Sequence, residues 1–108
     1  PKEVVKPAVL WGEVPSKARK ASPRHQFAAW VTSPDNERFS QMIVNRLWKR
    51  FMGGGLVEPI DDFRDEHPCV NDQVMEFLCK QLVRSEFDLK QLTRMILYSQ
   101  TYQRAASA

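Results

Sequence analysis

The segment from residue 37 to residue 55 constrains the fold of this chain more than any other. Over residues 37–52 the apolar side chains recur with the period of an α-helix, and Gly53-Gly54-Gly55 follows directly. At ~100° per residue they form one broad apolar face, made of Phe39, Ile43, Val44, Leu47, Trp48 and Phe51. Gln41, Asn45 and Lys49 fall on the other side. A face this wide indicates the central helix of a small bundle, and the glycines end that helix in a sharp turn.

Three further helices are predicted around it. One runs over residues 24–32 and is broken at residues 33–36, where Asn36 is placed to cap the central helix through its side-chain oxygen. A third runs from the Asn71 cap to residue 85, with a core stripe of Val74, Met75, Leu78, Leu82 and Val83. A fourth follows Asp88, which with Gln91 resembles a capping box, and reaches residue 99. Its apolar face holds Leu89, Leu92 and Ile96, with Ser99 beside them.

The rest of the chain is predicted to be irregular. Residues 1–23 hold four prolines and read as an extended arm or linker, of which Val9, Leu10 and Trp11 could dock on the helices. We expect a long ordered loop over residues 56–70 and a frayed tail over residues 105–108. Apart from that tail, residues 24–104 are expected to form a single helical domain. The predicted fold class is therefore all-α, a small bundle of about four helices with an extended N-terminal arm.

Composition excludes several classes of protein. The chain has 108 residues, enough for one small domain, and 43% of them are hydrophobic, too many for a disordered chain. A net charge of +3 supports solubility better than nucleic-acid binding, and residues 17–20 are more simply a solvated linker than a phosphate-binding arm. No apolar stretch approaches the ~18 residues of a membrane span. The chain starts without a methionine or a signal peptide, so we expect a piece of a longer protein.

The two cysteines do not form a metal or haem motif. Cys69 and Cys79 are too far apart for a Cys-x-x-Cys-His haem attachment, and nothing near them has zinc-ligand spacing. Cys79 lies in an apolar helical run, which favours a buried free thiol. A Cys69–Cys79 disulfide stays open as the alternative if the loop folds back onto that helix.

Several linked motifs occur in a fixed order along residues 24–104. They are Phe27-Ala28-Ala29-Trp30-Val31-Thr32-Ser33-Pro34-Asp35-Asn36, Val44-Asn45-Arg46-Leu47-Trp48, Gly53-Gly54-Gly55-Leu56-Val57, Asp62-Phe63, Phe87-Asp88-Leu89-Lys90-Gln91-Leu92 and Ser99-Gln100-Thr101-Tyr102-Gln103. In these motifs the chain closely resembles a planctomycete cytochrome-associated domain of unknown function, the DUF 1553 family. The chain departs from that pattern in two places: Glu37 replaces a usual proline, and residues 71–75 replace a usual His-Pro-Glu-Leu-Leu.

The resemblance implies what kind of protein this chain belongs to, but it implies no reaction and no ligand. Such domains resemble C-terminal parts of large bacterial proteins that also carry a cytochrome c-like domain and a second uncharacterised domain. The parent protein is then expected to be exported to the periplasm or cell envelope, with any haem held elsewhere. The expected partners are the neighbouring domains of the parent, and this chain is expected to hold no cofactor or metal of its own.

Asn45, Arg46, Asp61 and Asp62 are the candidate binding residues. Asn45 and Arg46 lie between apolar neighbours on the central helix, and an arginine grips carboxylates through two parallel hydrogen bonds. One interpretation is a site for a ligand or partner. The other, which the pattern favours, is structural: Arg46 pairs with Asp61 or Asp62 across the glycine turn while Asn45 bonds loop backbone.

No catalytic residues are predicted, because no nucleophile, base and orienting group come together in the sequence. The leading hypothesis is a non-catalytic structural or interaction module. The alternative is part of an active site, lined by the helix of Asn45 and Arg46 and by the loop of Asp61 and Asp62, and completed by a neighbouring domain. A third and weaker alternative is nucleic-acid binding through residues 17–24 and 49–50.

Overall fold

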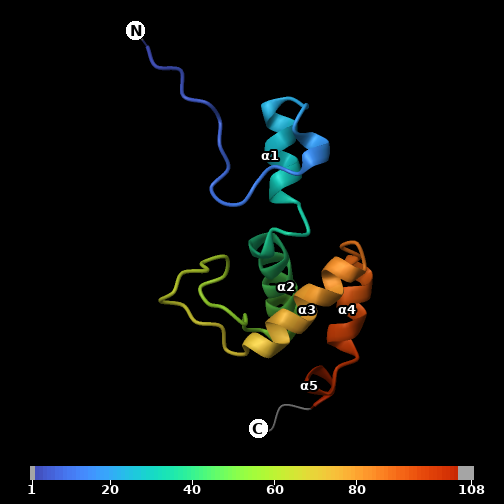
Figure 1. Ribbon diagram of the computed structural model, residues 1–108. Helices are drawn as coiled ribbons and strands as arrows, with labels where there is room; N and C mark the ends of the chain where they lie inside the picture. Colours follow the sequence, from blue (N-terminus) through green and yellow to red (C-terminus); the bar gives the residue numbers. More distant parts are fainter. Residues whose placement is uncertain (1, 105–108) are drawn as a thin grey trace. The chain divides into compact units, whose positions relative to one another are not determined.

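The computed structural model describes residues 2–104, and over this range the chain is helical without strands (Figure 1). The helices are η1 (Ser16–Ala18, a 3-10 turn), α1 (Pro23–Val31), α2 (Glu37–Met52), α3 (Asp72–Arg84), α4 (Leu89–Leu97) and α5 (Gln100–Gln103). The predicted all-α class is confirmed, and the four long helices lie close to their predicted bounds. The short helices η1 and α5 were not predicted. The predicted frayed tail, residues 105–108, lies outside the described residues.

The chain divides into two compact units, one up to Phe39 and one from Ser40 onward. In the first, Ser22 caps α1 by accepting a hydrogen bond from the amide of His25, and Pro23 takes the first helical position. Trp30 of α1 is buried against Trp11, with ring centroids 5.0 Å apart, and its indole N–H donates to the Trp11 carbonyl at 2.9 Å. The docking of Trp11 is confirmed, whereas Leu10 is exposed.

The predicted cap by Asn36 is wrong. The side-chain nitrogen of Asn36 donates to the carbonyl oxygens of Trp30 at 3.4 Å and Val31 at 3.0 Å. These carbonyls belong to the last turn of α1, where helical partners run out. Asn36 therefore ends the first helix, and its Oδ1 accepts no hydrogen bond from the described residues.

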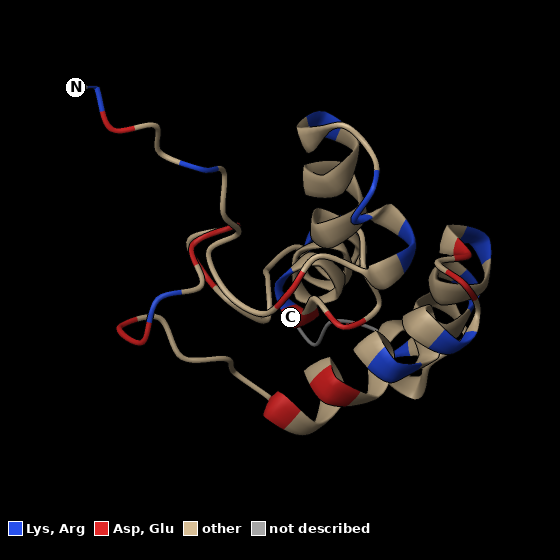
Figure 2. Cartoon of the chain, turned by 45° about the horizontal axis from the view of Figure 1, so that its top comes forward, with Lys and Arg blue, Asp and Glu red and all other residues tan. Residues whose placement is uncertain are grey.

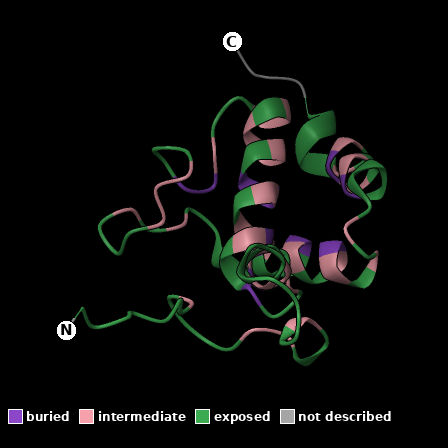
Figure 3. Ribbon diagram, turned by 90° about the horizontal axis from the view of Figure 1, so that it is seen from above, coloured by how far each residue is buried: buried purple, intermediate pink, exposed green. Residues whose placement is uncertain are grey.

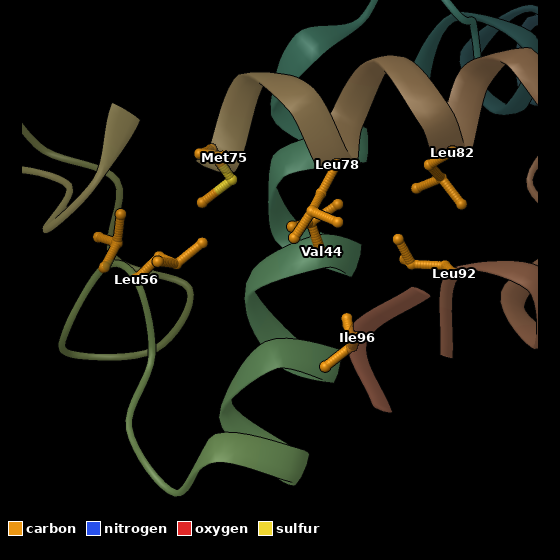
Figure 4. Close-up of a cluster of buried hydrophobic side chains, with 8 residues drawn as sticks. Val44, Leu56, Met75, Leu78, Leu82, Leu92 and Ile96 are labelled. Carbon is orange, nitrogen blue, oxygen red and sulfur yellow. The ribbon is translucent and has the colours of Figure 1, made fainter. Parts of the chain in front are cut away.

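The second unit encloses the hydrophobic core (Figure 4). Side chains from α2, the following loop, α3 and α4 meet there; the buried set is Val44, Leu56, Val57, Met75, Leu78, Leu82, Leu92 and Ile96. These helices carry buried positions on one side and exposed positions on the other (Figure 3). The predicted stripes of α3 and α4 supply five of the eight, since Met75, Leu78 and Leu82 come from α3 and Leu92 and Ile96 from α4.

The turn between α3 and α4 is tight and has no glycine. Asp88 caps α4 by accepting from the amides of Lys90 and Gln91, as predicted. The amide of Asp88 itself donates to Ser85 Oγ at 3.3 Å, so Ser85 takes the part expected of Gln91. Glu86 and Phe87 have φ of 55° and 63°, a left-handed conformation that is costly for both. Phe87 packs against the core, which offsets that cost.

Both cysteines are free and half-buried beside the core, so the disulfide alternative is absent. Cys79 Sγ lies 3.8 Å from Met75 Sδ, one helical turn earlier. Burial raises the pKa of the Cys69 thiol, which keeps it protonated at neutral pH.

Candidate functional site

Asn45 of α2 holds the backbone of the loop that follows the glycine turn. Its Nδ2 donates to the Val57 carbonyl at 2.9 Å, and its Oδ1 accepts from the Val57 amide at 3.0 Å. Asn45 is fully buried, which corrects its expected place on the polar side of α2. The loop covers it, and the side chains of Leu56 and Val57 belong to the buried core. The expected bond from Asn45 to loop backbone is present.

Arg46 pairs with Asp61 through two parallel hydrogen bonds. The guanidinium Nε donates to Asp61 Oδ1 at 2.9 Å, and Nη2 donates to Oδ2. Both groups stay in contact with water, since the side chains are 62% and 29% exposed. The hydrogen bond from Arg46 lowers the pKa of Asp61, and the same bond raises the pKa of Arg46. Asp61 has φ 67°, a conformation that aspartate adopts more readily than most residues.

A third contact joins Lys49, one turn along α2, to Glu58. Lys49 Nζ lies 2.9 Å from Glu58 Oε1, and the same oxygen accepts from the Gly55 amide at 2.7 Å. The bonds from Lys49 and then Gly55 lower the pKa of Glu58. Three residues of α2 thus bond three residues of the loop, in the pairs Asn45–Val57, Arg46–Asp61 and Lys49–Glu58. We call these six residues the loop clasp.

Asp62, the fourth candidate, is not part of the clasp. Its carboxylate accepts two hydrogen bonds from Arg64, each of 2.8 Å, and lies 3.3 Å from His67 Nδ1. The bond from Arg64 is the main cause that lowers the pKa of Asp62. The structure therefore joins Asn45, Arg46 and Asp61 in the contacts between α2 and the loop and places Asp62 in a separate cluster within the loop. Figure 2 shows acidic and basic positions along this loop.

Gly55 is required by close approach. A Cβ at this position would lie 2.7 Å from the Val57 carbonyl oxygen and 3.0 Å from Asn45 Oδ1, and both contacts are too short. Gly53 has φ 89° and serves the turn itself, whereas a Cβ at Gly54 would meet nothing within 4 Å. Gly53 and Gly55 are thus each required for a different reason, Gly53 for its backbone conformation and Gly55 for the lack of space for a side chain.

Sequence reasoning missed Lys49, Glu58 and Gly55 as parts of this arrangement. The spacing of Lys49 from Asn45 and Arg46 was a usable signal, because residues i and i+4, or i and i+3, are neighbours on a helix surface. The register of the loop was not predictable, since it depends on which backbone group meets Asn45.

The clasp can hold the loop against α2, because its polar groups bond one another. Within residues 2–104, no three His, Cys, Asp or Glu side chains are grouped to bind a metal ion. No helix in the described part of the chain is long and apolar enough to cross a membrane.

These features define a small helical module in which a polar clasp fixes a long loop against the second helix. The chain belongs to the family described as PSD1, protein of unknown function (DUF1553), whose family model matches residues 23–108. This confirms the DUF1553 assignment made from the motifs. Comparison with curated proteins and with solved structures found no match.

Proposed function

We propose that this domain is a non-catalytic interaction module that packs against a neighbouring domain of a larger protein. The observation that carries the proposal is the exposed face of α4. Leu89 is 48% exposed there, over a hollow of about 320 Å³ that Lys90, Thr93 and Arg94 also line. An exposed apolar centre with a polar rim is the composition of a protein interface.

The charges on this face point to the kind of partner. No described ion pair involves Lys90 or Arg94, and both residues are exposed. A partner surface with an apolar centre and acidic residues around it would complement them. We assign that surface to the domain that adjoins this one in its parent protein.

The clasp supports the same proposal. An active-site interpretation would need Arg46 and Asp61 to be available to a substrate, whereas each bonds the other, and Asn45 is occupied by Val57. The shared motif then serves to fix the loop, and binding falls to the helical surface. As part of the proposal, the parent is a planctomycete-type protein exported to the cell envelope, with any haem in its cytochrome-like domain.

The experiment is a titration of this chain with the purified neighbouring domain by calorimetry. Leu89→Ser, and Lys90→Glu with Arg94→Glu, should each weaken binding by about tenfold or more, since interface energy is concentrated in few residues. Tyr98→Ser is the matched control, because Tyr98 is exposed but nine residues from Leu89, on the opposite side of the helix axis. Equal affinity of all four proteins would refute the assignment to α4.

A further inference from the structure

The first unit contains a cavity of about 340 Å³ that neither the clasp nor α4 uses. Its walls come from the turn over residues 11–16, from α1 and from the segment that follows α1. The rings of Trp11 and Trp30 form its apolar wall, meeting edge to face at 61°. Trp11 is half exposed, so part of its ring is available to a bound molecule. Pockets for small molecules start at about 300 Å³, so this one suits a small ligand.

The charges in the wall favour a cation. Glu13, Arg19 and Asp35 contribute to the lining. Glu13 is neutralised by Arg19, whose Nη2 lies 2.6 Å from Glu13 Oε2 and whose Nε donates to the Val14 carbonyl at 3.3 Å. No described ion pair involves Asp35, so its carboxylate is left as the uncompensated charge. A carboxylate in a cavity that two indole rings also line attracts cations, since ring faces carry negative potential.

Asn36 forms a fixed part of the cavity wall. It lines the cavity and is 7% exposed, and its side-chain nitrogen is held by the carbonyls of Trp30 and Val31. This fixes the amide orientation and leaves Oδ1 as a buried acceptor with no described donor. Oδ1 has almost no accessible surface, so Asn36 serves the cavity as a fixed part of its wall.

We propose that this cavity binds a primary ammonium group, with the alkyl chain against Trp11 and Trp30 and the N–H groups directed to Asp35. The group could belong to a free amine or to a lysine side chain of a polypeptide. The site is independent of the interface assigned to α4.

The test follows the indole N–H signals of Trp30 and Trp48 by NMR while the full chain is titrated with n-butylammonium. The Trp30 signal should move and saturate, while that of Trp48, on α2, stays in place. Neutral n-butanol should bind about tenfold more weakly or not at all, because it lacks the charge-assisted hydrogen bonds. Nα-acetyl-lysine amide distinguishes the sources: tighter binding than n-butylammonium points to a polypeptide, and equal or weaker binding points to a free amine.

Variants keep the proposal falsifiable. Asp35→Asn should weaken n-butylammonium binding by about tenfold, while the matched loop variant Asp65→Asn leaves it unchanged. Trp11→Ala should weaken it as well, with the helical circular dichroism unchanged. The proposal is overturned if n-butylammonium does not move the Trp30 signal, if n-butanol binds equally well, or if Asp35→Asn binds like the wild type.

Discussion

Asn45 and Val57 exchange two hydrogen bonds, so the side chain of a buried helix residue pairs with a loop backbone as a neighbouring strand would. A buried asparagine without such partners would be strongly unfavourable. Val57 is itself buried, and it satisfies the amide while adding its side chain to the core. This single relationship fixes where the chain goes after the glycine turn, and the Arg46 and Lys49 pairs reinforce it.

Asn45→Ala should destabilise the protein by about 3 kcal/mol, because it leaves the buried amide and carbonyl of Val57 without partners at about 1–3 kcal/mol each. Urea denaturation followed by circular dichroism measures the effect. Arg50→Ala, at an exposed position of the same helix, is the control and should change stability by less than about 0.5 kcal/mol. Similar losses for both variants would show that Asn45 is not special.

The glycine triplet offers a matched pair. Gly55→Ala should cost about 1–3 kcal/mol, because the new methyl group collides with the Val57 carbonyl and with Asn45. Gly54→Ala meets nothing and should be neutral or stabilise by up to about 1 kcal/mol. Thermal melts of the two variants should therefore shift in different directions or by clearly different amounts. Equal melting temperatures would contradict the close approach at Gly55.

The clasp should weaken in acid. The pKa values of Asp61 and Glu58 lie below their ordinary values of 3.8 and 4.5, because Arg46 and Lys49 bond the charged forms. The stabilisation they contribute is fully present above those ordinary values and is lost as the pH falls through the lower folded-state values. Cleavage of the loop by pepsin should therefore rise steeply below about pH 4. Asp61→Asn should be cleaved more readily already at pH 5; if it resists like the wild type, Asp61 contributes nothing to holding the loop.

The left-handed turn between α3 and α4 predicts one stabilising change. Glu86→Gly removes the strain of a positive φ at an exposed residue and should raise stability by about 0.5–1 kcal/mol, the difference between that strain and the flexibility of glycine. Phe87→Gly removes the same strain but also a ring packed on the core, so it should destabilise. Chemical denaturation of both variants measures the change in their free energy of unfolding. A destabilised Glu86→Gly would contradict the strain at this turn.

Helices and core were largely predictable, because both follow from local periodicity. The stripe of Met75, Leu78 and Leu82 is buried as its spacing predicts, and the caps at Asn71 and Asp88 form as expected. The family was also predictable, from motifs alone. The division into an arm over residues 1–23 and one domain over residues 24–104 stays a prediction.

The candidate site was predictable in part, for a physical reason. Pairing of Arg46 with Asp61 or Asp62 was expected, but choosing between them required the loop register. Asn45 looked polar and solvent-facing by helical angle, and only the loop that covers it makes it buried. Asn36 failed as a cap because a short side chain can serve either helix end, and the carbonyls of α1 lie within its reach.

The most direct test of the central claim, that the shared motif fixes the loop, is hydrogen exchange at the Val57 amide. In the wild type it should exchange as slowly as the core amide of Leu82, since it is buried and bonded to Asn45. In Asn45→Ala its exchange should exceed that of Leu82 by about tenfold or more. If the Val57 amide of the wild type exchanges at the rate of an unstructured peptide while Leu82 stays protected, the loop is not held and the account is wrong.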